Sequence, residues 1–213
     1  AADPEFVEAI RGWTEQHDVL FVLDEVITFR CEYGGLQERY DITPDLTALG
    51  KAIGGGFPVG AITGRKDVMD VMNPLSEKVL FPHSGTFSAN PVTLTAGLVA
   101  MEKFDKPAVD RLNALAKRVI DGIEKAIAET GSAACVTGAG SMFRIHMKEQ
   151  PPRNFREAFL TQEENQKLKT LLDHLFDEGF LMINTCSGAL STPMSETEID
   201  ALVGAIKTGF QKL

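Results

Sequence analysis

The sequence predicts an α/β fold with a mainly parallel sheet, followed by a smaller α+β domain. Two observations carry this prediction. An amphipathic helix is expected over residues 3–16, and it leads directly into an apolar segment, residues 19–23, that lacks polar alternation. Such a segment is typical of a strand buried on both faces of a parallel sheet. Nearer the C-terminus, short strands and two helices that each begin with a capping box indicate a second, α+β arrangement.

In the first part of the chain, capping residues and glycines mark the element boundaries. The first helix begins with Asp3 as its N-cap, followed by a proline in the first turn. Two further strands are expected over residues 45–50 and 59–64, on either side of a glycine cluster. The dipeptide Asn90-Pro91 then begins a helix that extends to about residue 104.

A long amphipathic helix is expected to connect the two parts of the chain. It follows Lys106-Pro107 and ends at Gly131, which is the expected C-cap. Apolar residues recur along one face with helical periodicity. They are Val109, Leu112, Leu115, Val119, Ile123 and Ile127.

Beyond this helix, the pattern predicts a small α+β domain. Strands are expected over residues 142–147 and 180–183, and the two helices begin at the capping boxes Thr161-x-x-Glu164 and Ser195-x-x-Glu198. The expected organisation is therefore a first domain, a connecting helix and a small C-terminal domain. These correspond to residues 1–106, 107–131 and 132–213.

The composition excludes several classes of function. The chain has 213 residues and a formal net charge of −9, which disfavours binding to nucleic acid or to an anionic membrane surface. No apolar run approaches the roughly 20 residues that span a bilayer, and the N-terminus has no signal-peptide pattern. The three cysteines, Cys31, Cys135 and Cys186, lack C-x-x-C spacing and the four histidines are dispersed, so neither a disulfide scaffold nor a metal site is expected. Together these features predict a cytoplasmic protein.

The sharpest local feature is the pair Asp24-Glu25, directly after the first apolar strand. Ligands of open α/β sheets collect at the carboxyl ends of strands, so a carboxylate there is a candidate ligand-binding group. The alternative is that both acids are solvated residues of a turn. Of the two, Glu25 is expected to support the loop rather than to react.

Lys51, between a strand and the glycines at 54–56, is the second candidate. Three interpretations are open: a phosphate-binding lysine, a Schiff-base lysine or an exposed charge. The Walker spacing fails, because the chain has Asp45 and Ala52 where glycine and Ser or Thr are required, and a Rossmann fingerprint fails at Val59. The glycines indicate either that a planar or anionic group lies against the loop or that the loop is a flexible turn.

A third feature is the segment His83-Ser84-Gly85-Thr86, which lies shortly before the helix capped by Asn90. Hydroxyls and small residues ahead of a helix N-terminus bind phosphate readily. The alternative is an ordinary capped helix preceded by a loop.

Three segments that contain these features occur in a characteristic order. They are LFVLDEVITFR, YDITPDLTALGKAIGGGFPVGAITGR and HSGTFSANPVTLTAGLVAM. Together they closely resemble the class III aminotransferases, and within them the branch of glutamate-1-semialdehyde aminomutase and β-amino-acid transaminases. The resemblance implies part of the large domain of a fold type I pyridoxal-phosphate (PLP) enzyme, over residues 1–106, and the small domain that follows it.

The resemblance also implies roles for individual residues. Lys51 corresponds to the lysine that forms an aldimine with PLP, Asp24 to the carboxylate that pairs with the pyridine nitrogen, and Val26 to the residue that packs against the ring. Gly85 and Thr86 resemble residues at the cofactor phosphate, with Thr86 reaching the cofactor of the partner subunit. This implies a homodimer with its active site at the interface.

The implied activity is PLP-dependent amino-group transfer between an amino acid or amine and a keto acid or aldehyde. A 2,1-aminomutase acting on glutamate-1-semialdehyde is the alternative, because it uses the same lysine chemistry. The resemblance covers about the second half of a family member, and the usual glycine/serine phosphate loop and ring-stacking aromatic residue are not found in the sequence. A third interpretation is therefore a catalytically incomplete module that only dimerises.

Overall fold

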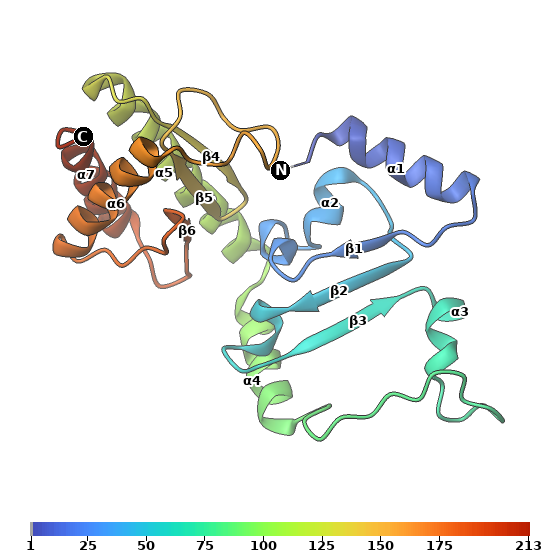
Figure 1. Cartoon of the computed structure of the whole chain (residues 1–213). Helices are drawn as coiled ribbons and strands as arrows, with labels where there is room; N and C mark the ends of the chain where they lie inside the picture. The colour runs from blue at the N-terminus through green and yellow to red at the C-terminus, as the bar shows by residue number, and fades with distance from the viewer. Residues whose placement is uncertain (1) are drawn as a thin grey trace. The chain divides into compact units, whose positions relative to one another are not determined.

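The computed structural model describes residues 2–213, and these form two compact units. The first unit ends at Val109 and the second spans Asp110–Leu213. Each unit has its own sheet of three strands, in the orders β1-β2-β3 and β4-β5-β6 (Figure 1). The two units are described separately below.

The sheet of the first unit is mixed, where a mainly parallel sheet is expected from the sequence. Strand β1 (Val22–Asp24) pairs in parallel with β2 (Leu46–Gly50), and β2 pairs antiparallel with β3 (Gly60–Gly64). The connection from β2 to β3 contains only nine residues, 51–59. A parallel crossover needs a dozen residues or more, so this short connection allows only an antiparallel return.

Helices surround this sheet at the ends of its strands. The capping predictions are confirmed: the Asp3 carboxylate accepts a hydrogen bond from the Glu5 N–H, and the Asn90 side chain accepts from Val92 and Thr93. The α-helices are α1 (Pro4–Gln16), α2 (Leu36–Tyr40), α3 (Lys66–Met69) and α4 (Pro91–Lys103), and 3₁₀ turns occupy Thr28–Cys31, Lys51–Gly54 and Asp70–Met72.

The apolar segment before Asp24 differs from its prediction in position and in burial. The strand begins at Val22 rather than at residue 19. Val19, Leu20 and Val22 are 45%, 49% and 54% exposed, so the segment is not covered on both faces within residues 2–213. A three-stranded sheet provides too few neighbouring elements to bury it.

Asp45, just before β2, links three segments of the first unit. Its carboxylate is 3% exposed and accepts hydrogen bonds from the Phe21 N–H at 2.8 Å, the Arg65 guanidinium at 2.7 Å and the Arg11 guanidinium at 2.9 Å. These bonds, with that from Phe21 contributing most, lower the pKa of Asp45 to about 2. One buried acid therefore connects helix α1 with the residues before β1 and after β3.

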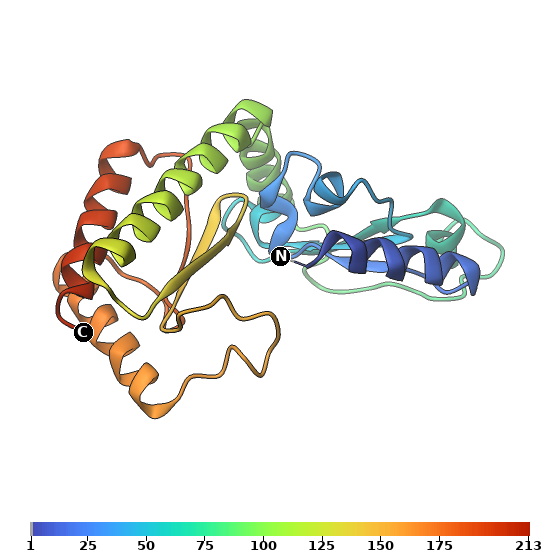
Figure 2. The same ribbon diagram turned by 90° about the horizontal axis from the view of Figure 1, so that it is seen from above.

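The second unit packs three helices against one face of its sheet (Figure 2). Val136, Phe143 and Ile145 are buried on this face, and a Cβ on Gly138 would contact Ile120 of helix α5. The elements are α5 (Lys106–Thr130), β4 (Cys135–Ala139), β5 (Met142–His146), α6 (Gln162–Asp177), β6 (Ser187–Ala189) and α7 (Glu196–Phe210).

Most predictions for this region are confirmed. Five of the six apolar residues predicted to form the buried face of α5, all except Ile127, are 0–7% exposed. Both capping boxes are formed, from Thr161 with Glu164 and from Ser195 with Glu198. None of the helices formed by residues 2–213 combines the length and apolar character that a bilayer span requires.

One strand prediction is wrong. Residues 180–183 do not form a strand, and Leu181 and Ile183 are 85% and 60% exposed. The edge strand is instead β6, whose sequence Ser-Gly-Ala lacks the apolar alternation that would have indicated it. It forms because its backbone pairs with β5, with Ser187 opposite Arg144.

The Asp45 network predicts acid sensitivity of the first unit. Its contribution to stability is fully present above the pKa of an unfolded aspartate, about 4, and is lost as the pH falls toward the folded pKa of about 2. Asp45→Asn is expected to lower the free energy of unfolding by about 1–3 kcal/mol at neutral pH and to flatten its dependence on acid pH. Urea unfolding followed by fluorescence of Trp13, the only tryptophan, measures both effects.

Asp67→Asn is the matched control for this experiment. Asp67 also pairs with Arg65, but its side chain is 66% exposed. Its substitution should change the free energy of unfolding by less than about 1 kcal/mol. Equal effects of the two substitutions would contradict the role given to Asp45.

Candidate functional site

Asp24 and Lys51 lie at the same edge of the first sheet. Asp24 is the last residue of β1 and is aligned with Ala48 of the parallel strand β2, whereas Lys51 directly follows the end of β2 at Gly50. The carboxyl ends of parallel strands meet at one edge, where open α/β sheets bind ligands. The structure therefore brings the two principal candidates to a common edge.

Both charged groups are accessible and lack an ionic partner. Asp24 is exposed, and its Oδ1 accepts a hydrogen bond from the Val26 N–H at 3.0 Å. Lys51 is exposed as well, and within residues 2–213 its amine forms neither a hydrogen bond nor an ion pair. A carboxylate and an amine without an ion pair in the described residues are thus available at this edge of the sheet.

The backbone at Lys51 has an unusual conformation. Its φ angle is +49°, in the left-handed region that residues other than glycine, asparagine and aspartate rarely adopt. Such conformations persist only where the surroundings enforce them, and they cluster at functional sites. No sequence pattern indicated this feature.

Val26 packs over the residue that precedes Lys51. A Cβ placed on Gly50 would lie 3.3 Å from Val26 Cγ1 and 3.4 Å from the Val59 carbonyl oxygen. Glycine at position 50 thus lets the Val26 side chain lie directly beside the start of the 3₁₀ turn Lys51–Gly54, called the lysine turn below. The contact of Val26 with a cofactor ring stays a prediction.

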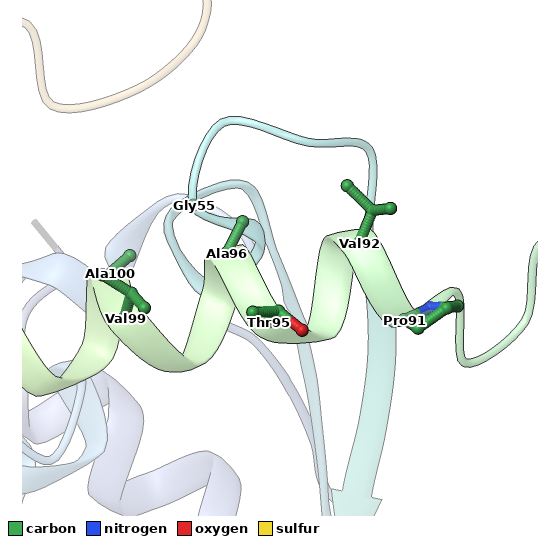
Figure 3. A pocket seen from close by; sticks show the side chains of 7 residues that line it. All are labelled: Gly55, Pro91, Val92, Thr95, Ala96, Val99 and Ala100. Atoms are coloured by element: carbon green, nitrogen blue, oxygen red, sulfur yellow. The ribbon is translucent and has the colours of Figure 1, made fainter.

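The glycines after Lys51 allow a close approach to helix α4 (Figure 3). A Cβ on Gly55, whose φ is +58°, would collide with the Ala96 carbonyl, and a Cβ on Gly97 would collide with the Ile53 carbonyl. The neighbour of Gly55 is therefore a helix backbone, rather than the planar or anionic group considered from the sequence. An open pocket of about 710 Å³ lies beside this contact, between Gly55 and the face of α4 that includes Pro91, Val92, Thr95, Ala96, Val99 and Ala100.

Glu25 holds the loop that follows β1. Its side chain is fully buried, and its carboxylate accepts hydrogen bonds from the Thr28 hydroxyl at 2.6 Å, the Leu36 N–H at 3.0 Å and the Gln37 N–H at 2.9 Å. The two amides belong to the first turn of α2, which otherwise lacks acceptors for them. The backbone N–H of Glu25 also donates to the Ala48 carbonyl at 2.9 Å, so this residue fixes the chain directly after Asp24.

Gly85 and Thr86 lie in the exposed loop before α4. The Gly85 carbonyl accepts a hydrogen bond from the Ser88 N–H at 3.0 Å, and both residues are exposed. Within the described residues, no hydrogen bond joins Thr86 to Asp24 or Lys51. In this chain, the structure therefore does not connect the predicted phosphate residues to the other two candidates.

The family of the chain follows from comparison with known proteins. The family model for class-III aminotransferases matches residues 1–206, and the chain belongs to this family. A glutamate-1-semialdehyde 2,1-aminomutase of Akkermansia muciniphila is 37% identical over 98% of the chain and 49% of the relative. The chain thus spans about half the length of this curated relative.

Solved structures agree in fold. An omega-transaminase from Sphaerobacter thermophilus is 40% identical, with a TM-score of 0.96 over 99% of this chain and 48% of that chain. A β-phenylalanine aminotransferase from Variovorax paradoxus is 33% identical, with a TM-score of 0.87 over 97% of this chain and 47% of that chain. Another neighbour, 29% identical with a TM-score of 0.89 over 99% of this chain and 48% of that chain, is a transaminase with PLP bound.

The close approach at α4 predicts that position 97 tolerates no side chain. Gly97→Ala is expected to lower the free energy of unfolding of the first unit by about 1–3 kcal/mol, because the Ile53 carbonyl cannot move without shifting the lysine turn. Gly12→Ala in α1 is the control, since nothing lies within 4 Å of its Cβ position. It should instead raise stability by about 0.5–1 kcal/mol. If Gly97→Ala left the free energy of unfolding unchanged, α4 would not confine the 3₁₀ turn Lys51–Gly54.

The Glu25 network predicts a large effect from a small substitution. Glu25→Gln replaces one acceptor oxygen by an NH₂ group that faces N–H donors, so the first unit should lose about 1–3 kcal/mol of unfolding free energy, measured by urea unfolding at Trp13. Glu32→Gln is the control from the same segment. Glu32 pairs with Arg39 in a partly exposed position, and its loss should cost less than about 1 kcal/mol. Equal costs would contradict the anchoring role of Glu25.

Proposed function

We propose that this chain is the lysine-bearing part of a PLP-dependent enzyme that transfers amino groups between an amino acid or amine and a keto acid or aldehyde. The observation that carries the proposal is the placement of Asp24 and Lys51, both without an ionic partner, at one edge of two parallel strands. Membership of the class-III aminotransferase family supports it.

The residues of this site have distinct roles in the proposed reaction. When bound, PLP supplies an electron-withdrawing ring that stabilises negative charge on a substrate carbon. The Asp24 carboxylate would keep a proton on the ring nitrogen, and Val26 would orient the ring from one face. The Lys51 Nζ atom would bind the cofactor carbonyl and, as a free neutral amine, would accept a proton from the substrate carbon and return it.

The proposal includes a homodimer in which Gly85 and Thr86 contact the phosphate of the partner subunit's cofactor. Their exposed position supports this role, as does the apolar surface of the helix that follows them. Val92, Leu94 and Leu98 of α4 are 57%, 56% and 60% exposed, although a helix that is apolar on all sides is normally buried. A second copy of the chain would cover such a surface.

The proposal also includes small-molecule substrates and a location in the cytoplasm. The net charge of −9 favours small-molecule substrates over nucleic acid or anionic membrane. Within residues 2–213, Cys31, Cys135 and Cys186 form no disulfide, which is the usual state of cysteines in the reducing cytoplasm. Within residues 2–213, no group of three metal-ligating side chains is assembled.

Two alternative functions are each favoured by a specific observation. A 2,1-aminomutase is favoured by the relative at 37% identity, a glutamate-1-semialdehyde 2,1-aminomutase. A dimer-forming module without activity is favoured by the exposed apolar residues of α4 described above.

Borohydride reduction in the presence of PLP tests the proposal. Peptide mass spectrometry is expected to find a pyridoxyl group on Lys51, and Lys51→Ala is expected to lower amino-transfer activity by about 10²–10⁴-fold or more, since it removes the proton-transferring amine. Lys66→Ala, an exposed lysine at the start of α3, is the control and should change neither result. Labelling at another lysine would refute the assignment. Labelling only in a chain extended to the length of the relatives would support the inactive module.

A further inference from the structure

Arg144 carries a positive charge in the middle of the second sheet and forms no ion pair within residues 2–213. It lies at the centre of β5, with Thr137 of β4 and Ser187 of β6 directly opposite it. Directly opposite residues of antiparallel strands project from the same face, so both hydroxyl residues flank the arginine. The three residues lie on the face opposite to that of Phe143 and Ile145.

The Arg144 side chain has unused hydrogen-bonding capacity. Its Nε atom is shielded from solvent and has no hydrogen-bond partner, and within residues 2–213 its guanidinium forms no ion pair. Buried charged donors are normally paired, because an unpaired one forfeits its hydration without replacement. The residue as a whole is partly exposed, so a small molecule can reach it.

Neighbouring polar groups already have partners. The His146 ring lies 2.9 Å from the Thr137 hydroxyl, and the Thr185 and Ser187 hydroxyls lie 3.0 Å apart. Lys148, the nearest other cation of this segment, is bound by both oxygens of Glu164 at 3.0 Å. Within residues 2–213, no acidic side chain forms an ion pair with Arg144.

The net charge on the sheet face that contains Arg144 determines which anions can bind there. Burial, and after it the charges of Arg144 and Lys148, lower the pKa of His146, so its ring is neutral at physiological pH. One positive charge thus remains for the ligand to neutralise. A planar monoanion satisfies it, and a carboxylate accepts two parallel N–H bonds from the planar guanidinium. A phosphate dianion would retain an uncompensated charge.

We propose that Arg144, together with the hydroxyls of Ser187 and Thr185, forms a binding site for the carboxylate group of a small-molecule acid. The Thr185 and Ser187 hydroxyls bond to each other, so one of their two protons lies between them and the other can turn toward an anion held by the guanidinium. The site consists of residues of the second unit alone. Its occupancy therefore does not depend on whether Lys51 carries a cofactor.

Nuclear magnetic resonance of the 213-residue chain without cofactor tests this site, with sodium propionate as the probe. The Arg144 Nε–H resonance is expected to shift saturably, with a dissociation constant on the order of 1 mM. Arg144→Lys should weaken binding about tenfold because it loses the bidentate geometry, and Ser187→Ala about threefold. Arg153→Lys is the matched control, since its side chain is 88% exposed, and should leave binding unchanged.

Several results would overturn the proposal. An Arg144 resonance that shifts no further with propionate than with sodium chloride would show ionic screening alone. Saturable binding that survives Arg144→Lys and Arg144→Gln without change would place the acid elsewhere. Thermal unfolding of each variant separates lost binding from lost folding, and Arg144→Lys preserves the charge should Arg144→Gln fail to fold. Failure of the Lys51 labelling experiment would leave the propionate result unaffected, so the two proposals fail independently.

Discussion

The parallel pairing of β1 with β2 is the constraint on which the candidate site depends. Because the strands run in the same direction, residues that follow them emerge at one edge, and Asp24 and Lys51 meet there although they are 27 positions apart in the sequence. An antiparallel pairing would have sent Lys51 to the opposite edge. The pairing continues one step beyond β1, through the bond from the Glu25 N–H to the Ala48 carbonyl at 2.9 Å. The buried Glu25 carboxylate then anchors the outgoing loop to α2, so Asp24 has a fixed position although its side chain is exposed.

Lys51 is confined by backbone packing. Its turn has a positive φ, and the next residues lie so close to α4 that neither Gly55 nor Gly97 has space for a Cβ. An interface that excludes even a methyl group holds the chain firmly, since there is no side chain that could change rotamer and relieve a shift. The amine at the end of a long flexible side chain therefore starts from a well-defined backbone. For the proposed role of Lys51, accepting and returning a proton at one carbon atom, this restriction of the starting point is a physical advantage.

Local sequence signals predicted the helices whose ends are capped by nearby residues. They failed where contacts between distant residues determine the conformation. Asp3, Asn90 and the capping boxes at Thr161 and Ser195 satisfy helix N–H groups within three residues, so their helices were predictable. Strand β6 is held only by pairing with β5, and the conformation of Lys51 only by its surroundings, so neither had a sequence signature. The placement of Asp24 and Lys51 at one edge of the sheet was predictable, because each directly follows a segment that the sequence indicated as a strand. The partner of the glycines remained open, because a sequence cannot distinguish glycines that approach a ligand from glycines that approach a helix.

The pairing of individual charged residues distinguishes structural residues from candidate functional ones more clearly than the net charge of −9 does. Asp45 is bound by two arginines and one amide, and Glu25 by a hydroxyl and two amides, so both acids are consumed by the fold. Within residues 2–213, Asp24, Lys51 and Arg144 form no ion pair, although folding could have neutralised each of them with one of the 30 acidic or 21 basic residues of the chain. An unpaired charge on a rigid strand or turn gains nothing from the fold. Its stabilisation is therefore left to groups outside the described residues, and these three positions, rather than the better-connected acids, are where ligands are expected.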